Sequence, residues 1–389
     1  MRILMFSHGY VPTVSGVTLV VQKIARAMVR RGHEVTVVTA SERGKPYQSE
    51  DEGVRLVRTR GIPNPGWSEG PIPFISPSAI RTLADQFQPD VIHTHENAVL
   101  SNLLLRVKWE DPRPLISSCY SLPSYTTQYP PFRWVKSGVE ALLWKVMVDN
   151  LNRFDQVIFC TRTHEKDFLA HGLHRPTTVI SNGIDIQRYR PQKEAGEDIE
   201  RRYSLPPGPR ILSVGRLMKD KKLDLLIQAM SQICCTGREA HLLVVGRGDD
   251  RPHLTTLIHQ LKLESFIHLL GFVPEQDLPA LYRACDLFAI PSLVEVQSLP
   301  ALQAAVTGLP IVAADSAALP ELVRHGENGF LVEPLNTRAL GDAILYILDH
   351  PDKARRMGQV SLTIGRAHDE QITFQAYEDF YQRMAELRR

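Results

Sequence analysis

The sequence lacks an apolar run long enough to cross a membrane. A spanning helix needs about 20 consecutive, predominantly apolar residues. The two longest stretches without charge, residues 114–132 and 296–314, are interrupted by proline, serine, threonine and glutamine. The apolar run at residues 1–6 is too short for a signal peptide and predicts a first β-strand. We therefore expect a cytoplasmic protein that is either soluble or peripheral on the inner face of the plasma membrane.

Cysteine is scarce, and its spacing suits no metal ion. An odd count of five without such spacing favours reduced, buried thiols over a disulfide framework. The Gly-x-Gly-x-x-Gly fingerprint is missing after the first predicted strand, which disfavours a nicotinamide enzyme. The cysteines are Cys119, Cys160, Cys234, Cys235 and Cys285.

Net charge is low, at +2, but it is unevenly distributed. Residues 1–190 carry about +6 and the remainder about −4. A basic half can serve an anionic membrane, a phosphorylated substrate or nucleic acid, or it can be ordinary solvated surface. Of these partners we expect an anionic membrane surface and no nucleic acid.

The 389 residues are too many for one ordinary core and predict two domains of similar size. Short β-branched runs alternate with amphipathic helices in both halves, which is typical of parallel sheets with helices on both faces. A proline-rich, charged segment at 191–209 marks the predicted linker. We predict an α/β fold with two doubly wound, Rossmann-like domains, 1–190 and 210–365, facing across a crevice. A C-terminal helix at 366–389 is expected to pack back on the first domain.

Two loops in the first half carry residues suited to a ligand. Gly16 precedes a helix N-terminus, where the backbone can approach a phosphate, although a plain strand–turn–helix has the same pattern. His93 and His95 end a predicted strand and share one face of it. A hydrogen bond from histidine to a sugar hydroxyl or a backbone carbonyl is favoured over a metal pair, because no third ligand is spaced nearby.

Two loops in the second half carry charge. Arg216 and Lys221 lie between a predicted strand and a helix, where cations can neutralise a departing diphosphate, although a solvated basic turn is the alternative. Glu295 lies between a buried strand and a helix start. There it could cap the helix electrostatically, but its position on the strand end favours facing the crevice.

The order and spacing of these segments resemble those of the retaining, two-domain (GT-B type) glycosyltransferases with two glutamates eight residues apart in a signature loop. The nearest likeness is to diacylglycerol glycosyltransferases. The resemblance covers almost the whole chain. It rests on residues 30–38, 93–96, 181–185, 214–217, 245–248, 271–274, 291–295 and 326–332.

This resemblance implies transfer of a hexose from a nucleoside-diphosphate sugar. His95 and Glu295 would be the catalytic residues and would contact the transferred sugar. The acceptor would attack from the leaving-group side and the β-phosphate would take its proton, so no protein nucleophile is required. The absence of an Asp-x-Asp triplet agrees with a reaction that needs neither metal nor cofactor. The implied donor-binding residues are Gly16, Gly215, Arg216, Lys221, Val273, Gln297, Ser298, Leu299 and Gln303.

Three positions depart from the family pattern. Ser15 replaces the first of two glycines, Lys222 replaces a glycine after the lysine, and Gln303 replaces the second glutamate. A neutral amide loses the charge-assisted bond to a ribose hydroxyl, so we expect weaker or altered nucleotide binding. A non-catalytic sugar-nucleotide-binding protein and a nucleotide-sugar epimerase are the alternatives.

Residues 113–155 are expected to bind the acceptor, through Tyr120, Tyr125 and Trp134. Aromatic residues beside Arg133 and Lys136 suit a membrane interface, and a membrane glycerolipid is the preferred acceptor. A soluble sugar, an inositol phosphate or a small natural product is the alternative. Equally, the tryptophans of this segment could be core residues of an ordinary helix.

Overall fold

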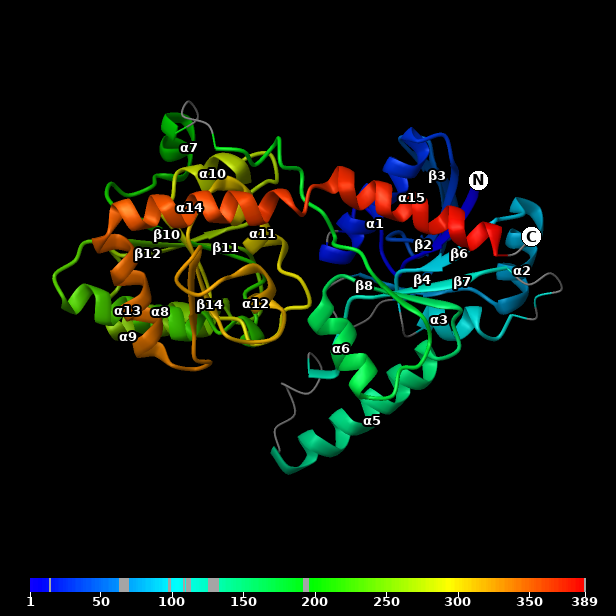
Figure 1. The fold of residues 1–389 in the computed structure, drawn as a ribbon, viewed down its shortest axis with the longest axis horizontal. Coiled ribbons are helices and arrows are strands. Elements are labelled where there is room, and N and C mark those ends of the chain that lie inside the picture. Colours follow the sequence, from blue (N-terminus) through cyan, green and yellow to red (C-terminus); the bar gives the residue numbers. More distant parts are fainter. Residues whose placement is uncertain are drawn as a thin grey trace. The chain divides into compact units, whose positions relative to one another are not determined.

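The computed structural model describes residues 1–13, 15–62, 70–96, 99–107, 109, 113–124, 133–191 and 196–387, without the side chains of 133–137 and 196–197. Within these residues the chain forms two compact units. The first comprises residues 1–182 and 371–389, and the second comprises residues 183–370. Each unit is built on one predominantly parallel sheet with helices on both faces (Figure 1), as the sequence pattern predicts.

The sheet of the first unit has the order β3-β4-β2-β1-β6-β7-β8-β9 in the described part, with β5 paired to β4. All neighbours run parallel except the β3–β4 and β4–β5 pairs. The order reverses at β1 and β6, which is where doubly wound sheets place ligands. The strands are β1 (Arg2–Phe6), β2 (Glu34–Ala40), β3 (Tyr47–Asp51), β4 (Val54–Ile62), β5 (Ile72–Phe74), β6 (Val91–Thr94), β7 (Leu115–Cys119), β8 (Gln156–Phe159) and β9 (Thr177–Val179).

The helices of the first unit divide between the two faces of this sheet. In Figure 1, α1 and the C-terminal helix α15 lie on one side, whereas α3, α5 and α6 lie on the other. Alternate residues of β1 serve each face, and Leu4 and Phe6 pack with α2 and α3 in one buried cluster. The helices are α1 (Gly16–Arg30), α2 (Pro77–Phe87), α3 (Val99–Leu104), α5 (Arg133–Leu151), α6 (Arg162–Ala170) and α15 (Glu370–Glu386).

The sheet of the second unit is wholly parallel, in the order β12-β11-β10-β13-β14-β15. Its strands are apolar on both faces, as a sheet covered on both sides requires. For example, Ile211 packs toward α8 and α13, whereas Leu212 packs toward α10 and α11. The strands are β10 (Arg210–Val214), β11 (His241–Val245), β12 (Ile267–Gly271), β13 (Leu287–Ile290), β14 (Ile311–Ala314) and β15 (Gly329–Val332).

Helices and one 3-10 turn connect these strands. The turn η1 follows β10, and α11 follows β13. Ser298 caps α11 by accepting a hydrogen bond from the Ala301 amide, and Gly308 ends the helix at φ 86°, a left-handed conformation that glycine adopts without strain. The elements are α7 (Gly196–Tyr203), η1 (Lys219–Lys221), α8 (Leu223–Cys235), α9 (Arg251–Leu261), α10 (Leu278–Arg283), α11 (Leu299–Thr307), α12 (Leu319–Leu322), α13 (Thr337–Asp349) and α14 (Pro351–Arg366).

The two units divide at residues 182 and 183, earlier than the linker predicted at 191–209. The described part of that segment belongs to the second unit, because α7 packs against α10. Two side chains of α7 anchor it there: Arg202 and Tyr203 bind the two oxygens of Asp277 at 2.7 and 2.8 Å. Residues 371–389, which include all of α15 except its first residue, are grouped with the first unit.

Two sequence expectations concern thiols and membranes. The cysteines form no disulfide with one another: Cys119, Cys160 and Cys285 are buried, whereas Cys234 is half-buried and Cys235 is exposed, contrary to the expectation of uniformly buried thiols. No helix in the described part is long and apolar enough to span a bilayer.

Candidate functional site

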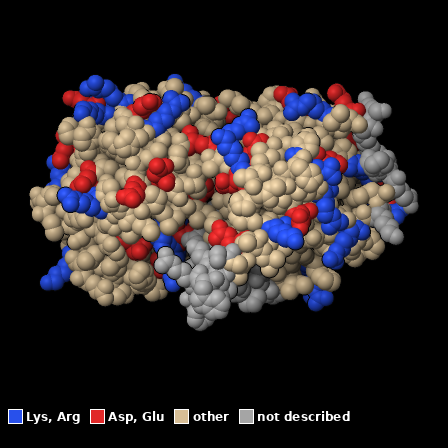
Figure 2. Space-filling model, turned by 60° about the horizontal axis from the view of Figure 1, so that its bottom comes forward, with Lys and Arg blue, Asp and Glu red and all other residues tan. Residues whose placement is uncertain are grey.

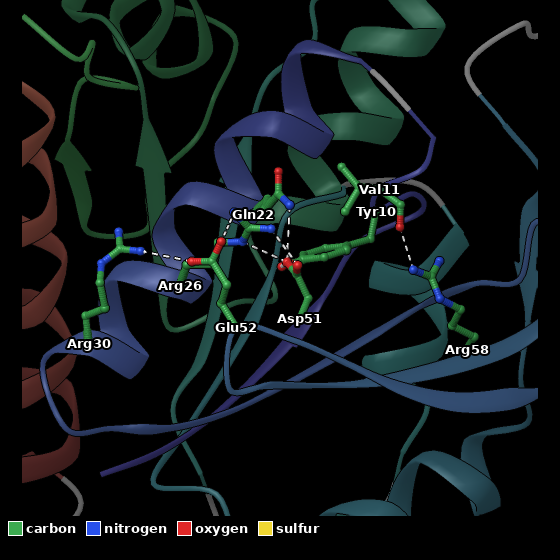
Figure 3. A network of polar contacts seen from close by, with 8 residues as sticks. All are labelled: Tyr10, Val11, Gln22, Arg26, Arg30, Asp51, Glu52 and Arg58. Atoms are coloured by element: carbon green, nitrogen blue, oxygen red, sulfur yellow. Dashed lines mark hydrogen bonds and ion pairs between the residues drawn. The ribbon is translucent and has the colours of Figure 1, made fainter. Parts of the chain in front are cut away.

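The loop between β1 and α1 is held by a network of polar side chains (Figure 3). Tyr10 donates to Asp51 Oδ2 at 2.8 Å, and Arg26 of α1 binds both oxygens of that carboxylate at 2.8 and 2.5 Å. Arg58 of β4, which is only 4% exposed, donates to the carbonyl oxygen of Val11 at 2.5 Å. Strands β3 and β4 thus fix the loop that leads into α1.

The charge state of this network is set by Asp51. Burial acts to raise the pKa of Asp51, but hydrogen bonds from Arg26, Tyr10 and Gln22 outweigh it and lower the pKa to about 2. Burial, followed by the bond to Asp51, raises the pKa of Tyr10. At neutral pH Asp51 is therefore ionised and Tyr10 is a neutral donor.

Gly16 is the first residue of α1, and Ser15 caps the helix. Ser15 Oγ accepts from the Thr18 amide at 3.2 Å, and Thr18 Oγ1 accepts from the Ser15 amide at 2.7 Å. Apart from its two chain neighbours and the backbone of its own helix, no described atom lies within 4 Å of the place where a Cβ on Gly16 would stand. The backbone at this helix N-terminus is therefore open on that side.

His93 and His95 lie at the end of β6 in a buried polar cluster. The two rings lie against each other with centroids 3.9 Å apart and their planes tilted by 40°. Both nitrogens of His93 are engaged, Nδ1 with Tyr381 Oη at 2.7 Å and Nε2 with Ser118 Oγ at 2.8 Å. His93 therefore has no nitrogen left for a metal ion. No group of three or more metal-ligating residues occurs in the part of the chain described.

His95 keeps one nitrogen for a ligand. Its Nδ1 lies 3.2 Å from Tyr120 Oη, whereas its Nε2 is buried and has no partner among the described residues. Burial lowers the pKa of His95 to about 3, so the ring is neutral at physiological pH. A neutral imidazole with one free nitrogen can hydrogen-bond a hydroxyl group.

Of the three expected acceptor residues, the structure describes only one side chain. Tyr120 stacks on His95 with ring centroids 6.0 Å apart. Tyr125 and the side chain of Trp134 lie outside the described residues. Trp144 stacks on His171 at 3.8 Å and meets Phe168 edge-on, so it packs against α6, although it is half-buried and not a core residue.

In the second unit, Lys221 and Glu295 form an ion pair. Lys221 Nζ lies 2.7 Å from Glu295 Oε1 and 3.4 Å from Asp220 Oδ2, and the Lys221 and Glu295 side chains are 16% and 10% exposed. Burial acts to lower the pKa of Lys221, but the charges of Glu295 and Asp220 outweigh it and raise the pKa. The lysine is therefore fully protonated. Arg216 is exposed in the same β10–η1 turn.

Backbone hydrogen bonds join the two loops that carry this pair. The Leu293 amide and Ser292 Oγ both donate to the carbonyl oxygen of Asp220, at 3.3 and 3.4 Å. The Ala318 amide donates to the carbonyl oxygen of Glu295 at 3.1 Å. The loop that carries Glu295 is thus held by the β10–η1 turn and by the residues around Ala318, and the sequence analysis identified only the former.

The glycines near the Lys221–Glu295 pair are of two kinds: two allow close packing of backbone against backbone, and one leaves the turn open. A Cβ on Gly246 would stand 1.8 Å from the Gly215 carbonyl oxygen, and one on Gly248 would stand 2.2 Å from that of Leu217. Glycine is needed at both positions because the loop after β11, which contains them, packs directly against the β10–η1 turn. At Gly215 itself nothing described lies within 4 Å of a Cβ, so the turn is open there.

The remaining predicted donor residues lie around α11 and β12. Ser298 uses its hydroxyl to cap α11, while Gln297 and Leu299 flank it half-buried. Val273 follows β12 and is 3% exposed in the core, so only its backbone is available to a ligand. Its neighbour Phe272, which the sequence analysis did not select, is 56% exposed and lies under the guanidinium of Arg247 at 5.3 Å.

Gln303 is engaged on both sides of its amide. Its Nε2 donates to Tyr189 Oη at 2.9 Å, and its Oε1 accepts from Tyr282 Oη at 2.9 Å. The Tyr282 hydroxyl also lies 3.1 Å from the carbonyl oxygen of Pro300. In this structure the Gln303 amide therefore links α11 to two buried tyrosines. The sequence analysis identified neither tyrosine, because both are distant in sequence.

The structure thus brings His95 and Tyr120 together in the first unit, and Lys221 and Glu295 together in the second. The sequence matches two sequence families, Glycosyltransferase Family 4 over residues 14–188 and Glycosyl transferases group 1 over residues 197–361. These two matches account for most of both units.

Individual proteins resemble the chain along nearly its whole length. A D-inositol 3-phosphate glycosyltransferase of Corynebacterium glutamicum is 27% identical over 88% of this chain and 86% of the relative. An alpha-monoglucosyldiacylglycerol synthase of Acholeplasma laidlawii is 23% identical over 90% and 89%.

Solved structures share the fold. A sucrose-phosphate synthase of Thermosynechococcus elongatus superposes with a TM-score of 0.83, at 21% identity and 98% coverage of both chains. Anabaena HepE in complex with UDP-glucose has a TM-score of 0.76, at 22% identity, with 100% of this chain and 99% of that chain covered. The chain belongs to the group 1 glycosyltransferases with a family 4 N-terminal domain, and its fold is GT-B.

Proposed function

We propose that this chain is a retaining glycosyltransferase that moves a hexose from a nucleoside-diphosphate sugar to an acceptor alcohol, without a metal ion. The observation that carries this proposal is the buried ion pair of Lys221 and Glu295. The ammonium group comes from the same β10–η1 turn as the open backbone of Gly215 and the exposed Arg216, where it would meet the diphosphate. Preorganised cations stabilise the charge of such a leaving group.

The reaction breaks the bond between the anomeric carbon and the β-phosphate oxygen. The acceptor oxygen forms the new bond on the same face of the sugar, and its proton passes to the departing phosphate. Lys221 and Arg216 would hold the diphosphate, while Glu295 would contact the donor sugar. Retention follows from attack on the leaving-group side and needs no protein nucleophile. Glu295 suits orientation because Lys221 already engages its carboxylate at 2.7 Å.

The first unit would contribute His95. Its free Nε2 is suited to a hydroxyl of the transferred sugar, and its low pKa keeps the ring neutral. Support for the donor class comes from a solved relative of the same fold, which is described in complex with UDP-glucose. The open N-terminus of α1 at Gly16 is likewise suited to a phosphate group.

Replacement of Lys221 tests the proposal directly. Wild type should release nucleoside diphosphate and form a glycosylated product of retained anomeric configuration from a labelled donor, with EDTA present throughout. Lys221→Ala should lower kcat/KM by about 100-fold, since one preorganised charged donor is worth about 2.7–4 kcal/mol. Lys219→Ala is the matched control, because Lys219 is an exposed lysine in the same turn. Thermal unfolding of each variant separates lost catalysis from lost fold.

Three results would count against this function. An absence of turnover with every common donor, alone or with lipid extract, would favour a sugar-nucleotide-binding protein. The involvement of Gln303 in a tyrosine network is the observation that supports this alternative. Release of diphosphate with an altered free sugar and no acceptor product would indicate an epimerase. A product of inverted configuration would contradict the retaining mechanism alone.

For the acceptor we propose a membrane glycerolipid, reached through α5. Leu142 and Val146 of this helix are 61% and 53% exposed on neighbouring turns, with the exposed Lys145 between them. Exposed apolar residues beside a cation suit the surface of an anionic membrane. Basic and acidic side chains are interspersed over the face shown in Figure 2. We assign attachment to the exposed apolar residues of α5.

Liposome flotation tests this attachment. The protein should float with vesicles that contain anionic lipid, and Leu142→Asp with Val146→Asp should abolish flotation because both charges would enter the apolar layer. Leu169→Asp is a matched control, since Leu169 is 44% exposed on α6 instead of α5. Equal flotation of wild type and the double variant would contradict the assignment.

A soluble phosphorylated acceptor, such as an inositol phosphate, is the second candidate. It is favoured by the excess of basic residues in the first half and by the relative that is named as a D-inositol 3-phosphate glycosyltransferase. The same labelled-donor assay distinguishes the two acceptors by whether product partitions into organic solvent or water.

A further inference from the structure

The loop after β7 carries Tyr120, whose Oη lies 3.2 Å from His95 Nδ1. The next residue, Ser121, presents a carbonyl oxygen to two buried side chains. His164 Nε2 lies 3.1 Å from this oxygen, and Cys119 Sγ lies 3.5 Å from it. His164 and Cys119 are both at most 1% exposed. The backbone beside Tyr120 is therefore attached to the interior of the first unit.

His164 reaches this loop from the first turn of α6. The helix follows β8, which runs parallel to β7, so the loop and the helix leave the sheet at the same edge. Thr161 caps the helix by accepting a hydrogen bond from the His164 amide at 3.4 Å. The rings of Phe159 and Phe168 meet the imidazole edge-on, with centroids 5.0 and 5.3 Å away. The imidazole is thus packed in place with Nε2 toward the loop.

The chemistry of the contact gives its direction. A carbonyl oxygen can only accept, so His164 Nε2 carries the hydrogen and donates it to Ser121. Burial lowers the pKa of His164 to about 4, and the bond to Ser121 offsets this only in part, so the ring is neutral at physiological pH. The other polar contact of Nε2, with Cys119 Sγ at 3.8 Å, is weaker, because sulfur is a poor partner.

The second nitrogen of this ring separates packing from positioning. His164 Nδ1 is buried and has no partner among the described residues. A buried nitrogen without a hydrogen bond costs free energy, whereas an apolar side chain of similar size would fill the same space without that cost. Packing alone therefore does not account for a histidine at this position, and the donor at Nε2 does.

We infer that His164 is a positioning residue of the transfer site: by holding the carbonyl oxygen of Ser121, it keeps the Tyr120 hydroxyl beside His95 Nδ1. The Tyr120 ring also stacks on His95, with planes 11° apart and centroids 6.0 Å apart, so a shift of the loop would alter both contacts. The inference rests on the proposed function for the role of His95 toward the sugar, but not for the position of Tyr120.

Kinetics with the labelled donor measure the effect. His164→Leu removes the donor at similar size and should lower kcat about tenfold, while the donor KM changes by less than about twofold. His164→Gln should recover most of the loss, because its amide nitrogen takes the place of Nε2 and can donate to the same carbonyl. Phe168→Leu is the structural control: it loosens the packing around the imidazole and keeps the donor, so it should lower the melting temperature and leave kcat unchanged.

A double-mutant cycle tests whether Tyr120 is the link. If His164 acts through the Tyr120 hydroxyl, His164→Leu should change kcat by less than about twofold in a Tyr120→Phe background, although it costs about tenfold in wild type. Two independent effects would multiply instead.

Nuclear magnetic resonance of protein labelled with ¹⁵N-histidine gives a measurement without substrate. The His95 ring signals are assigned by comparison with His95→Gln. They should shift in His164→Leu, because the Tyr120 hydroxyl moves away from Nδ1. In His164→Gln and in Phe168→Leu they should stay close to their wild-type positions. If His164→Leu folds poorly, His164→Asn replaces it, since its shorter amide takes the place of Nδ1 and does not reach Ser121.

The inference is overturned if His164→Gln loses as much activity as His164→Leu, or if the effects of His164→Leu and Tyr120→Phe multiply. It is also overturned if Phe168→Leu lowers kcat to the same extent, or if the His95 signals stay unchanged when the donor is removed. An absence of turnover in wild type, with the His95 signals shifting as expected, would instead contradict the proposed transferase function and leave the positioning of Tyr120 by His164 standing.

Discussion

At the scale of single residues, the turn between β10 and α8 shows what one departure from the family pattern does. Lys222 replaces a glycine there and adopts φ 52°, a left-handed conformation that costs a residue with a side chain about 1–2 kcal/mol. The same lysine precedes the first turn of α8, where a cation opposes the helix dipole. This departure from the family pattern is therefore a point of backbone strain.

Lys222→Gly should stabilise the protein by about 1 kcal/mol, because it relieves this strain and the dipole repulsion. Denaturant unfolding without ligand measures the change. Lys262→Gly is the matched control: Lys262 adopts φ 56° at the end of α9, where a cation is favourable, so its gain should be smaller. Lys222→Ala removes the charge and keeps the strain. A destabilised Lys222→Gly would show that the lysine side chain makes a compensating contact.

Predictions for single residues near the site were possible only where a pattern lies within a short stretch of sequence. Lys221 and Glu295 lie in the loops after β10 and β13, and the family resemblance gave Lys221 a donor-binding and Glu295 a catalytic role, which stay predictions; their direct contact at 2.7 Å was not foreseen. The partners of Gln303 were not predictable, because Tyr189 and Tyr282 are 114 and 21 residues away in sequence. A pairing that depends on tertiary packing leaves no pattern in a single sequence.

At the scale of elements, the alternation of strands and helices was predictable because burial on both faces makes parallel strands continuously apolar. The boundary between the units was not. Prolines and charges at 191–209 favour a linker, yet α7 within that segment is held on α10 by Asp277. The C-terminal helix was predicted to return to the first domain, and its aromatic residues line the buried cluster around His93.

The loop between β1 and α1 shows how elements combine to place a backbone. Its sequence gives only a glycine and a cap, whereas its anchors come from β3 and β4 through Asp51 and Arg58. These anchors resist neutral and mildly acidic conditions, since the pKa of Asp51 lies near 2, below the ordinary value for an aspartate. The carboxylate stabilises the folded chain above its ordinary pKa, and this contribution is lost only as the pH falls toward 2.

At the scale of the whole molecule, each unit has a hydrophobic core of its own, and the proposed donor residues apart from Gly16 lie in the second. We therefore predict two unfolding transitions. A nucleoside diphosphate should raise the midpoint temperature of only one of them. At a ligand concentration 100 times the dissociation constant, the free energy of unfolding increases by about 2.7 kcal/mol. For a unit of this size it corresponds to about 5–10 °C.

The distribution of tryptophan makes the two transitions separable. All four tryptophans fall within residues 1–182, so tryptophan fluorescence reports the first unit alone, whereas calorimetry reports both. Uridine, guanosine and adenosine diphosphates should each be tested. The one that matches the donor should raise the midpoint temperature of a transition that calorimetry detects and tryptophan fluorescence does not. Lys221→Ala should weaken that shift, and Lys219→Ala should preserve it. A shift confined to the fluorescent transition would place the nucleotide in the first unit and contradict the assignment of Lys221 and Glu295 to the donor.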